Sequence, residues 1–360
     1  MEHRMQQIVR HTWFLPVTIL VVAVIASSVI LATRLTGPDK QTAHSQHFTY
    51  ECELTNPKSM GCEQQHYARV TKTKNTAAAF AELKQSYNAD PNTKAYCHQL
   101  THAIGRAAAE QSKDIEDAYA KGDNFCWSGY YHGVMELMVK KVGAKNIEAK
   151  ITTICIKLAE KRSYSFDHYN CVHGLGHGVM AINANELFDA LKKCDRFQDQ
   201  WEASSCHSGV FMENVMAGLN PDTSTNYLKN DQPLYPCTAV GDRYKEQCYL
   251  MQTSQALKVV DYDYAEVFGL CATVGSYSAT CYQSLGRDAS GNSNSDVAQT
   301  KATCSLGKTA EARSNCVEGA VKDFISYYHS DKQAAELCQA FEPGLRDSCN
   351  AAKIEYYKSF

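Results

Sequence analysis

The sequence lacks the motifs that mark several enzyme classes. No G-x-S-x-G, H-E-x-x-H, P-loop or dinucleotide fingerprint occurs in its 360 residues. These absences exclude the usual signatures of serine hydrolases, zinc peptidases, nucleotide triphosphatases and dinucleotide-dependent enzymes. No C-x-x-C-H occurs either, which excludes the motif that attaches a c-type haem.

The chain also has little net charge, no glycosylation acceptor and few strand patterns. A formal net charge of -3 gives no broad electrostatic reason to bind nucleic acid. No Asn-x-Ser/Thr sequon is present, which disfavours a secretory protein of a eukaryote. Alternating apolar and polar runs bounded by turns are scarce, so the pattern favours an all-α fold.

Only one long apolar run is present, and it lies near the N-terminus. Trp13 to Ala32 carries no charge and is long enough, at about 1.5 Å per residue, to cross a bilayer. A cleaved signal peptide is the alternative, but its apolar region is usually about 7–15 residues and ends at a small-residue cleavage site. We predict a cytoplasmic tail at 1–12, a transmembrane anchor at 13–33 and a linker at 34–48.

The position of the cysteines predicts which side of the membrane the body occupies. None of the 16 cysteines precedes the apolar run. An even number of cysteines placed after such a run is typical of an oxidising compartment. We therefore expect a single-pass membrane protein whose N-terminus is cytoplasmic and whose body lies in the periplasm or outside the cell.

Beyond the linker, short helical patterns repeat. Eight of them, the A helices, are expected to open with a cysteine, and second patterns, the B helices, lie between them and often end in a cysteine. The spacing of about 34 residues is similar to that of two-helix solenoids such as tetratricopeptide repeats, although the tetratricopeptide signature itself is missing. We predict an all-α, disulfide-stapled, solenoid-like body with a His-rich region at 49–219 and a Cys-stapled region at 220–360. Gly286 to Ala298 is expected to interrupt the array as a loop, and Leu219 to Pro236 to bulge from it.

The order of the cysteines predicts how they pair. The end of each B helix should face the start of the next A helix, and the cysteines left over are assigned to each other. The predicted disulfides are Cys155–Cys171, Cys194–Cys206, Cys237–Cys248, Cys271–Cys281, Cys304–Cys316, Cys338–Cys349, Cys97–Cys126 and Cys52–Cys62.

An internal duplication carries the clearest chemical signal. Cys126–Met135 and Cys171–Met180 share C-x-x-G-x-x-H-G-V-M. The glycine three residues after the cysteine should let a neighbouring helix approach closely, and the glycine after the histidine should clear space beside the imidazole. Two histidine pairs, His98/His102 and His173/His177, have the i, i+4 spacing that places both side chains on one helix face.

These histidines predict a transition-metal site. Neutral imidazoles with carboxylates suit zinc or non-haem iron, and two imidazoles with a methionine suit copper. His102, His132 and His177 should point into one seam between A helices, so they are the first candidates for metal ligands. The candidate metal ligands are His98, His102, His132, His173, His177, His207 and Met212. The alternative is that these histidines and glycines only pack the inner helix layer.

Two functions follow from this pattern. The first is a membrane-anchored, extracytoplasmic helical-repeat binding protein with a His-based metal site and a protein partner on its repeat surface. The second is an extracytoplasmic zinc, iron or copper enzyme in which Glu136 or Glu213 acts as general base. No nucleic-acid partner is expected.

Overall fold

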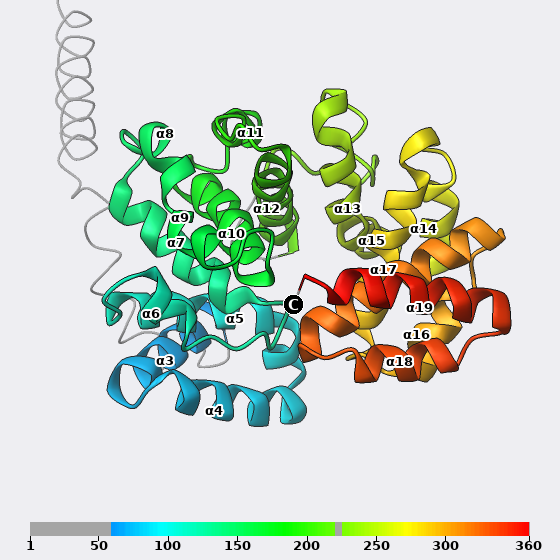
Figure 1. Cartoon of the computed structure of the whole chain (residues 1–360), viewed down its shortest axis with the longest axis horizontal. Helices are drawn as coiled ribbons and strands as arrows, with labels where there is room; N and C mark the ends of the chain where they lie inside the picture. Colours follow the sequence, from blue (N-terminus) through cyan, green and yellow to red (C-terminus); the bar gives the residue numbers. More distant parts are fainter. Residues whose placement is uncertain (1–58, 220–224, 360) are drawn as a thin grey trace, which may run out of the picture. The chain divides into compact units, whose positions relative to one another are not determined.

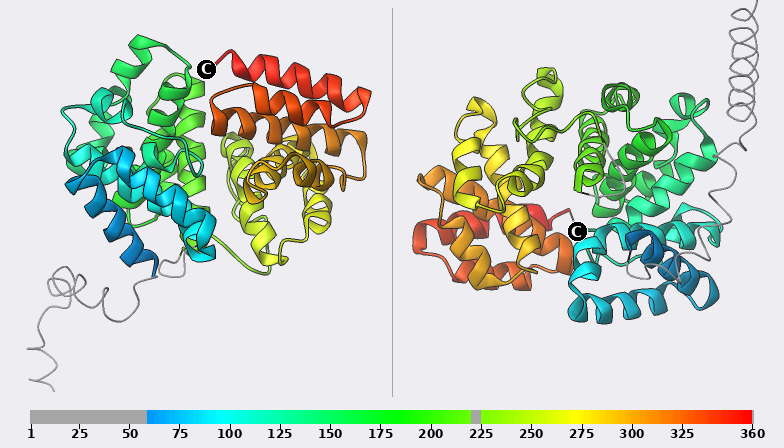
Figure 2. Two further views of the ribbon diagram at one scale, coloured as in Figure 1. Left: turned by 90° about the horizontal axis from the view of Figure 1, so that it is seen from below. Right: turned by 180° about the vertical axis from the view of Figure 1, so that it is seen from behind.

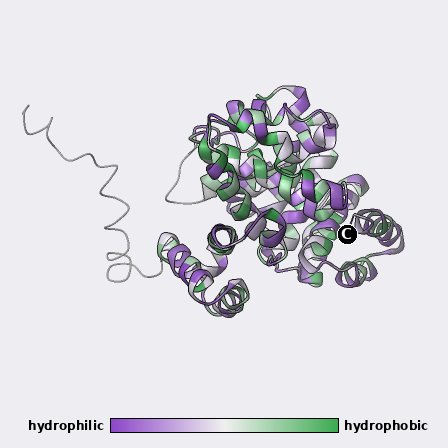
Figure 3. Cartoon of the chain, turned by 60° about the vertical axis from the view of Figure 1, so that its left-hand side comes forward, coloured by the Kyte–Doolittle hydropathy of each residue, from purple (hydrophilic) through white to green (hydrophobic). Residues whose placement is uncertain are grey.

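The computed structural model describes residues 59–219 and 225–359. The predicted tail, anchor and linker lie outside these residues. Within them every regular element is a helix, as predicted (Figure 1). None of the described helices is long and apolar enough to cross a membrane. Figure 3 shows hydrophobic and hydrophilic residues interspersed along each of them.

Eight helices form an inner series in which each packs on the next. These inner helices, which correspond to the predicted A helices, are α5 (Pro91–Glu110), α7 (Gly129–Val142), α10 (Phe166–Ile182), α12 (Gln200–Leu219), α13 (Asp242–Val259), α15 (Ser278–Asn292), α17 (Ala310–Tyr328) and α19 (Pro343–Tyr357). Contacts between successive members are those expected of a two-helix repeat.

The remaining helices are shorter on average; α3 and α4 precede the inner series, and the others lie between its members. They are α3 (Met60–Thr73), α4 (Thr76–Ala89), α6 (Ile115–Tyr119), α8 (Ile147–Lys150), η1 (Ile151–Thr153), α9 (Ile156–Lys161), α11 (Leu187–Cys194), α14 (Tyr264–Cys271), η2 (Gly275–Tyr277), α16 (Val297–Cys304) and α18 (Lys332–Gln339). Apolar faces of both sets form one continuous buried core. The expected B helix ending at Cys155 is instead split into α8, η1 and α9.

Most inner helices begin before the cysteine that was expected to open them. In α10 the side chain of Ser165 accepts a hydrogen bond from the backbone N–H of His168, so the helix starts at Phe166 and Cys171 lies in its second turn. In α5, Asp90 caps the helix and Pro91 occupies its first position. The capping residues, and not the cysteines, therefore set where these helices start.

The disulfide prediction is confirmed for the seven pairs that lie within the described residues. Six of them join the segment that precedes an inner helix to that helix, and the seventh, Cys97–Cys126, joins α5 to the segment just before α7. The remaining predicted pair involves Cys52, which lies outside the described residues. No cysteine of the described part is free.

The expected loop at Gly286 to Ala298 is wrong over half its length. Helix α15 continues to Asn292, and only the short turn before α16 is irregular. A Cβ on Gly286 would lie 1.8 Å from the carbonyl oxygen of Cys316, so this glycine permits close contact between α15 and α17. Tertiary packing thus outweighs the weak helix propensity of the segment.

The end of the inner series returns to its third member, α10, and does not run on as an open solenoid. The backbone N–H of Phe166, at the start of α10, donates to the carbonyl of Ser359 at 3.2 Å. Arg162 donates to the carbonyl of Lys358 at 2.9 Å. In the left view of Figure 2 the C-terminus, at the end of α19, lies beside the green segment that leads into α10. A cavity of about 1100 Å³ lies inside this circuit and is lined by residues of all eight inner helices.

Candidate metal centre

Five of the predicted histidines converge in the interior. We call His98, His102, His132, His173 and His177 the imidazole cluster. They come from three adjacent inner helices: two from α5, one from α7 and two from α10. All five are at most 5 % exposed. The ring of His132 lies between the two pairs, 5.4 Å from His102 and 4.2 Å from His177 between ring centroids.

Two glycines, Gly133 of the duplicated motif and Gly209 of α12, allow neighbouring inner helices to approach closely around the cluster. A Cβ on Gly133 would lie 2.0 Å from the carbonyl oxygen of His102. A Cβ on Gly209 would lie 1.9 Å from the carbonyl oxygen of His173. Since both contacts are to backbone, glycine is the residue that these positions require.

In each i, i+4 pair the two Nε2 atoms face each other. The Nε2 atoms of His98 and His102 are 3.0 Å apart, and those of His173 and His177 are 3.2 Å apart. The Nδ1 atoms point outward to other partners. His98 Nδ1 lies 2.9 Å from the carbonyl oxygen of Cys126, which can only accept a hydrogen bond. His98 is therefore held with the proton on Nδ1 and a lone pair on Nε2.

The two carboxylates predicted beside the histidines bind the outer nitrogens. Glu136 Oε1 lies 2.5 Å from His102 Nδ1, and Glu213 Oε2 lies 2.7 Å from His177 Nδ1. The other carboxylate oxygen of Glu136 accepts a hydrogen bond from Arg106. Carboxylates in this position fix the tautomer and orientation of metal-binding imidazoles. Their geometry suits this orienting role, and the role of general base stays a prediction.

The outer partner of His173 is a serine whose own proton is already used. Ser208 donates its hydroxyl hydrogen to the carbonyl of Ser205 at 2.7 Å. Its Oγ lies 2.8 Å from His173 Nδ1, so it accepts from that nitrogen. The Tyr169 hydroxyl, 3.2 Å from His173 Nδ1, is a second partner of that nitrogen.

Burial disfavours the charged form of four of the imidazoles. It lowers the pKa of His98 and of His173 to about 3, and the neighbouring imidazoles add to the effect on His98. Burial, followed by the neighbouring histidines, also lowers the pKa values of His132 and His177 well below the usual range. Neutral imidazoles are the form that binds metal ions.

The two carboxylates titrate in opposite directions. Burial opposes ionisation of Glu136, but His102 and Arg106 outweigh it and hold the pKa of Glu136 at about 2. Burial, helped by the charge of Glu136, raises the pKa of Glu213 to about 8. The centre therefore carries a single firmly ionised carboxylate, paired with Arg106.

The ligand atoms form three groups compact enough for a metal ion. Within each group the candidate atoms lie within 4.8 Å of one another. The groups are His98, His102 and His132; His132, His173 and His177; and His102, Glu136 and His177. The predicted trio of His102, His132 and His177 is thus divided among them. Met212 joins the centre through its Sδ, which lies 3.3 Å from His173 Nε2.

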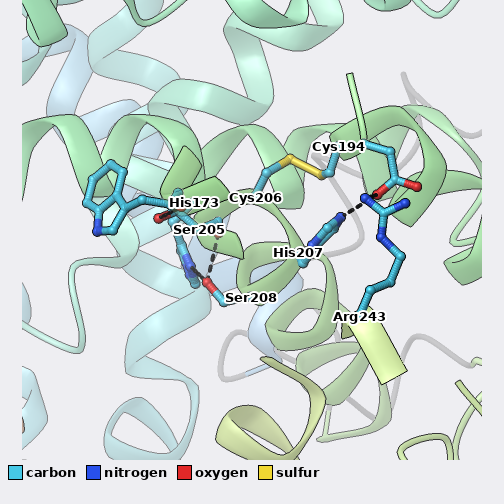
Figure 4. The surroundings of a disulfide bond; sticks show 9 residues. His173, Cys194, Ser205, Cys206, His207, Ser208 and Arg243 are labelled. Atoms are coloured by element: carbon cyan, nitrogen blue, oxygen red, sulfur yellow. Dashed lines mark hydrogen bonds and ion pairs between the residues drawn. A yellow bond between two sulfur atoms is a disulfide. The ribbon is translucent and has the colours of Figure 1, made fainter. Parts of the chain in front are cut away.

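His207 lies apart from the cluster. Its Nε2 is 3.0 Å from a carboxylate oxygen of Asp195, which also binds Arg243. Figure 4 shows His173 and His207 on opposite sides of α12, with the Cys194–Cys206 disulfide between them. Successive residues on a helix differ by about 100° in direction, so His207 cannot share the face that Ser208 and Met212 present to α10.

The structure also places residues that the sequence analysis did not single out. Arg106 lies one turn after His102 on α5 and binds Glu136, a position that the i, i+4 spacing could have indicated. Among the aromatic residues near the motif, Trp127 lines the cavity while Tyr130, Tyr131 and Phe211 are buried in the core. The cavity reaches the cluster because His98, His132 and His173 form part of its wall.

No protein-family model matches the chain, and no curated protein or solved structure is similar to it.

Proposed function

We propose that the protein binds a transition-metal ion through the imidazole cluster, in an oxidising compartment outside the cytoplasm. One observation carries the proposal: His98 Nε2 and His102 Nε2 face each other at 3.0 Å while both Nδ1 protons are bound elsewhere. Two lone pairs at this distance repel each other, and burial lowers the pKa of His98 to about 3. A metal cation resolves this arrangement.

The outer partners support the same proposal. Metal-binding imidazoles usually give their second N–H to a carboxylate, a carbonyl or another polar group. Such partners are present for four of the five rings: Cys126 O, Glu136, Ser208 and Glu213. The disulfides support the compartment, because thiols stay reduced in most cytosols.

Elemental analysis of the purified full chain tests the proposal. We expect bound zinc, iron or copper in the wild type and its loss in His132→Ala/His177→Ala, with all disulfides retained in both. His207→Ala is the matched control, since it removes an equally buried histidine outside the cluster and should leave the metal content unchanged. Equal metal content in the wild type and the double variant would contradict the proposal.

A second candidate function, a metalloenzyme, is favoured by the cavity. Its volume of about 1100 Å³ suits a drug-sized molecule, and it adjoins the cluster at His98, His132 and His173. The opposite wall is polar: Arg287 binds Asp288 at 2.9 Å, and Lys322 binds Glu318 at 2.7 Å. A metal ion at the cluster would face this space and could polarise a bound substrate or activate a water molecule.

The state of the metal's open position distinguishes the two functions. In a catalytic centre, azide added to the Co(II)-loaded protein should bind the ion and change its visible spectrum. In a closed binding site the spectrum should stay unchanged, because the protein supplies all the ligands.

A further inference from the structure

We propose that the centre holds two copper ions, one at His98, His102 and His132 and the other at His173, His177 and Met212. The inference rests on the proposed function, since it concerns the number and kind of ions at the same cluster. It follows from the distances within each i, i+4 pair, the orientation of His132 and the position of the Met212 thioether.

Each i, i+4 pair already has the spacing that a single ion needs. A metal ion about 2.0–2.1 Å from two nitrogens separates them by about 2.9 Å at a right angle and about 3.3 Å at the tetrahedral angle. The observed Nε2–Nε2 distances are 3.0 Å for His98 and His102 and 3.2 Å for His173 and His177. The pair on α5 and the pair on α10 can therefore each hold an ion of their own.

The orientation of His132 assigns it to the pair on α5. One of its nitrogens lies within 4.8 Å of either pair, so distance alone does not decide. Its ring is steeply inclined to both members of the α5 pair, at 64° to His98 and 87° to His102, and less so to His173 of the α10 pair, at 44°. Against His177 it is nearly parallel, at 18°, and parallel stacked imidazoles direct their lone pairs along separate lines. The first ion thus has three imidazole ligands.

The pair on α10 has a sulfur atom as its third ligand. Met212 Sδ lies 3.3 Å from His173 Nε2, a spacing comparable to that between the paired nitrogens. Thioethers are soft ligands that select Cu(I) over harder divalent ions. The second position is therefore a His2Met site.

The charges around the cluster also suit monovalent ions. Imidazole and thioether ligands bind a metal ion without adding negative charge, and the charge of Glu136 is already paired with Arg106. A buried cation without a counter-charge is costly, and the cost rises steeply with its charge. Two Cu(I) ions bring less charge into this interior than two divalent ions would.

Anaerobic titration of the full chain with Cu(I), against a competing chromogenic chelator, measures the stoichiometry. We expect two equivalents in the wild type. Met212→Leu, which nearly conserves volume, should weaken the second equivalent by at least about tenfold, since even substitutions outside the ligand shell cost that much. Met216→Leu is the matched control, because Met216 lies one turn further along α12 and also lines the cavity.

X-ray absorption at the copper edge supplies the second measurement. A sulfur scatterer should be present in the wild type and in Met216→Leu, and absent in Met212→Leu. His98→Ala/His102→Ala should lose one equivalent and keep the sulfur signal. If that variant does not fold, the wild-type stoichiometry and sulfur signal still decide.

One copper per chain, or no sulfur scatterer in the wild type, would overturn the two-ion inference while leaving the proposed function intact. Failure of the wild type to retain any zinc, iron or copper would overturn the proposed function itself. The two failures are therefore distinguishable in the same preparations.

Discussion

Substituting Gly133 by alanine should separate α5 from α7 and weaken metal binding. The new Cβ would lie 2.0 Å from the His102 carbonyl oxygen and 2.7 Å from its Cα, whereas real Cβ contacts below 3.0 Å essentially never occur. Because the clash is with backbone, the helices must move apart by about 1 Å. Metal–ligand distances tolerate only about 0.2 Å, so His98 and His102 would no longer share an ion with His132.

The expected cost in stability is modest because two effects oppose each other. Overpacking costs about 1–3 kcal/mol, and replacing a helical glycine by alanine returns about 1 kcal/mol. We expect a net loss of about 0–2 kcal/mol in the free energy of unfolding, measured by urea denaturation with the disulfides intact. Metal affinity should fall by at least about tenfold.

Gly269→Ala is the matched control for this experiment. Gly269 lies in α14, and a Cβ there meets nothing within 4 Å. This variant should gain stability from helix propensity alone and bind metal as the wild type does. The reasoning would be refuted if Gly133→Ala matched Gly269→Ala in both urea midpoint and metal affinity.

Three further predictions concern the rest of the chain. Replacing both cysteines of Cys97–Cys126 by alanine should lower the free energy of unfolding in urea by about 3.6 kcal/mol, and replacing those of Cys271–Cys281 by about 2.7 kcal/mol. The difference arises because the two disulfides span 29 and 10 residues. Equal losses, or a larger loss for Cys271–Cys281, would contradict the loop-length argument. Burial and the nearby charge of Asp288, partly opposed by Arg287, raise the pKa of Asp323 from 3.8 to about 7. Between those values only the folded state keeps this proton, so wild-type stability should fall as pH rises, by up to about 1.4 kcal/mol per pH unit relative to Asp323→Asn; a constant difference from pH 4 to pH 7 would exclude this contribution. Ending the chain at Tyr357 removes the carbonyls that bind Arg162 and the backbone of Phe166, and should increase hydrogen exchange at the start of α10; unchanged exchange there would show that these contacts do not hold the circuit closed.

The features that the sequence predicts well depend on short-range patterns. Helical periodicity predicts the all-α class, and cysteines that recur in a fixed order predict seven disulfides. His132 and His177 converge because the duplicated motif places them in equivalent positions on adjacent inner helices, and His102 of α5 joins them although it lies outside that motif. The roles of these residues as metal ligands remain predictions.

The features that the sequence does not predict depend on packing between distant segments. The return of the chain end to α10 leaves no local pattern, since it rests on backbone contacts of Phe166 and Ser359. Cys97-His98 and Cys206-His207 look alike in sequence, yet only His98 joins the cluster. The reason is that Cys97 is bound to the next inner segment, whereas Cys206 is bound to the preceding outer helix, so the two helices present different faces inward.

The seven disulfides also determine an order of assembly during synthesis. Each joins a cysteine to the next cysteine along the chain, and the two are separated by 10 to 29 residues. At about 5–20 residues per second, the second cysteine of each pair emerges about 0.5–6 s after the first. Pairing of each cysteine with the next one to be synthesised therefore gives the native connectivity, and rearrangement of distant partners is unnecessary. The final contacts between the chain end and α10 are then left to non-covalent docking, once all the disulfides are in place.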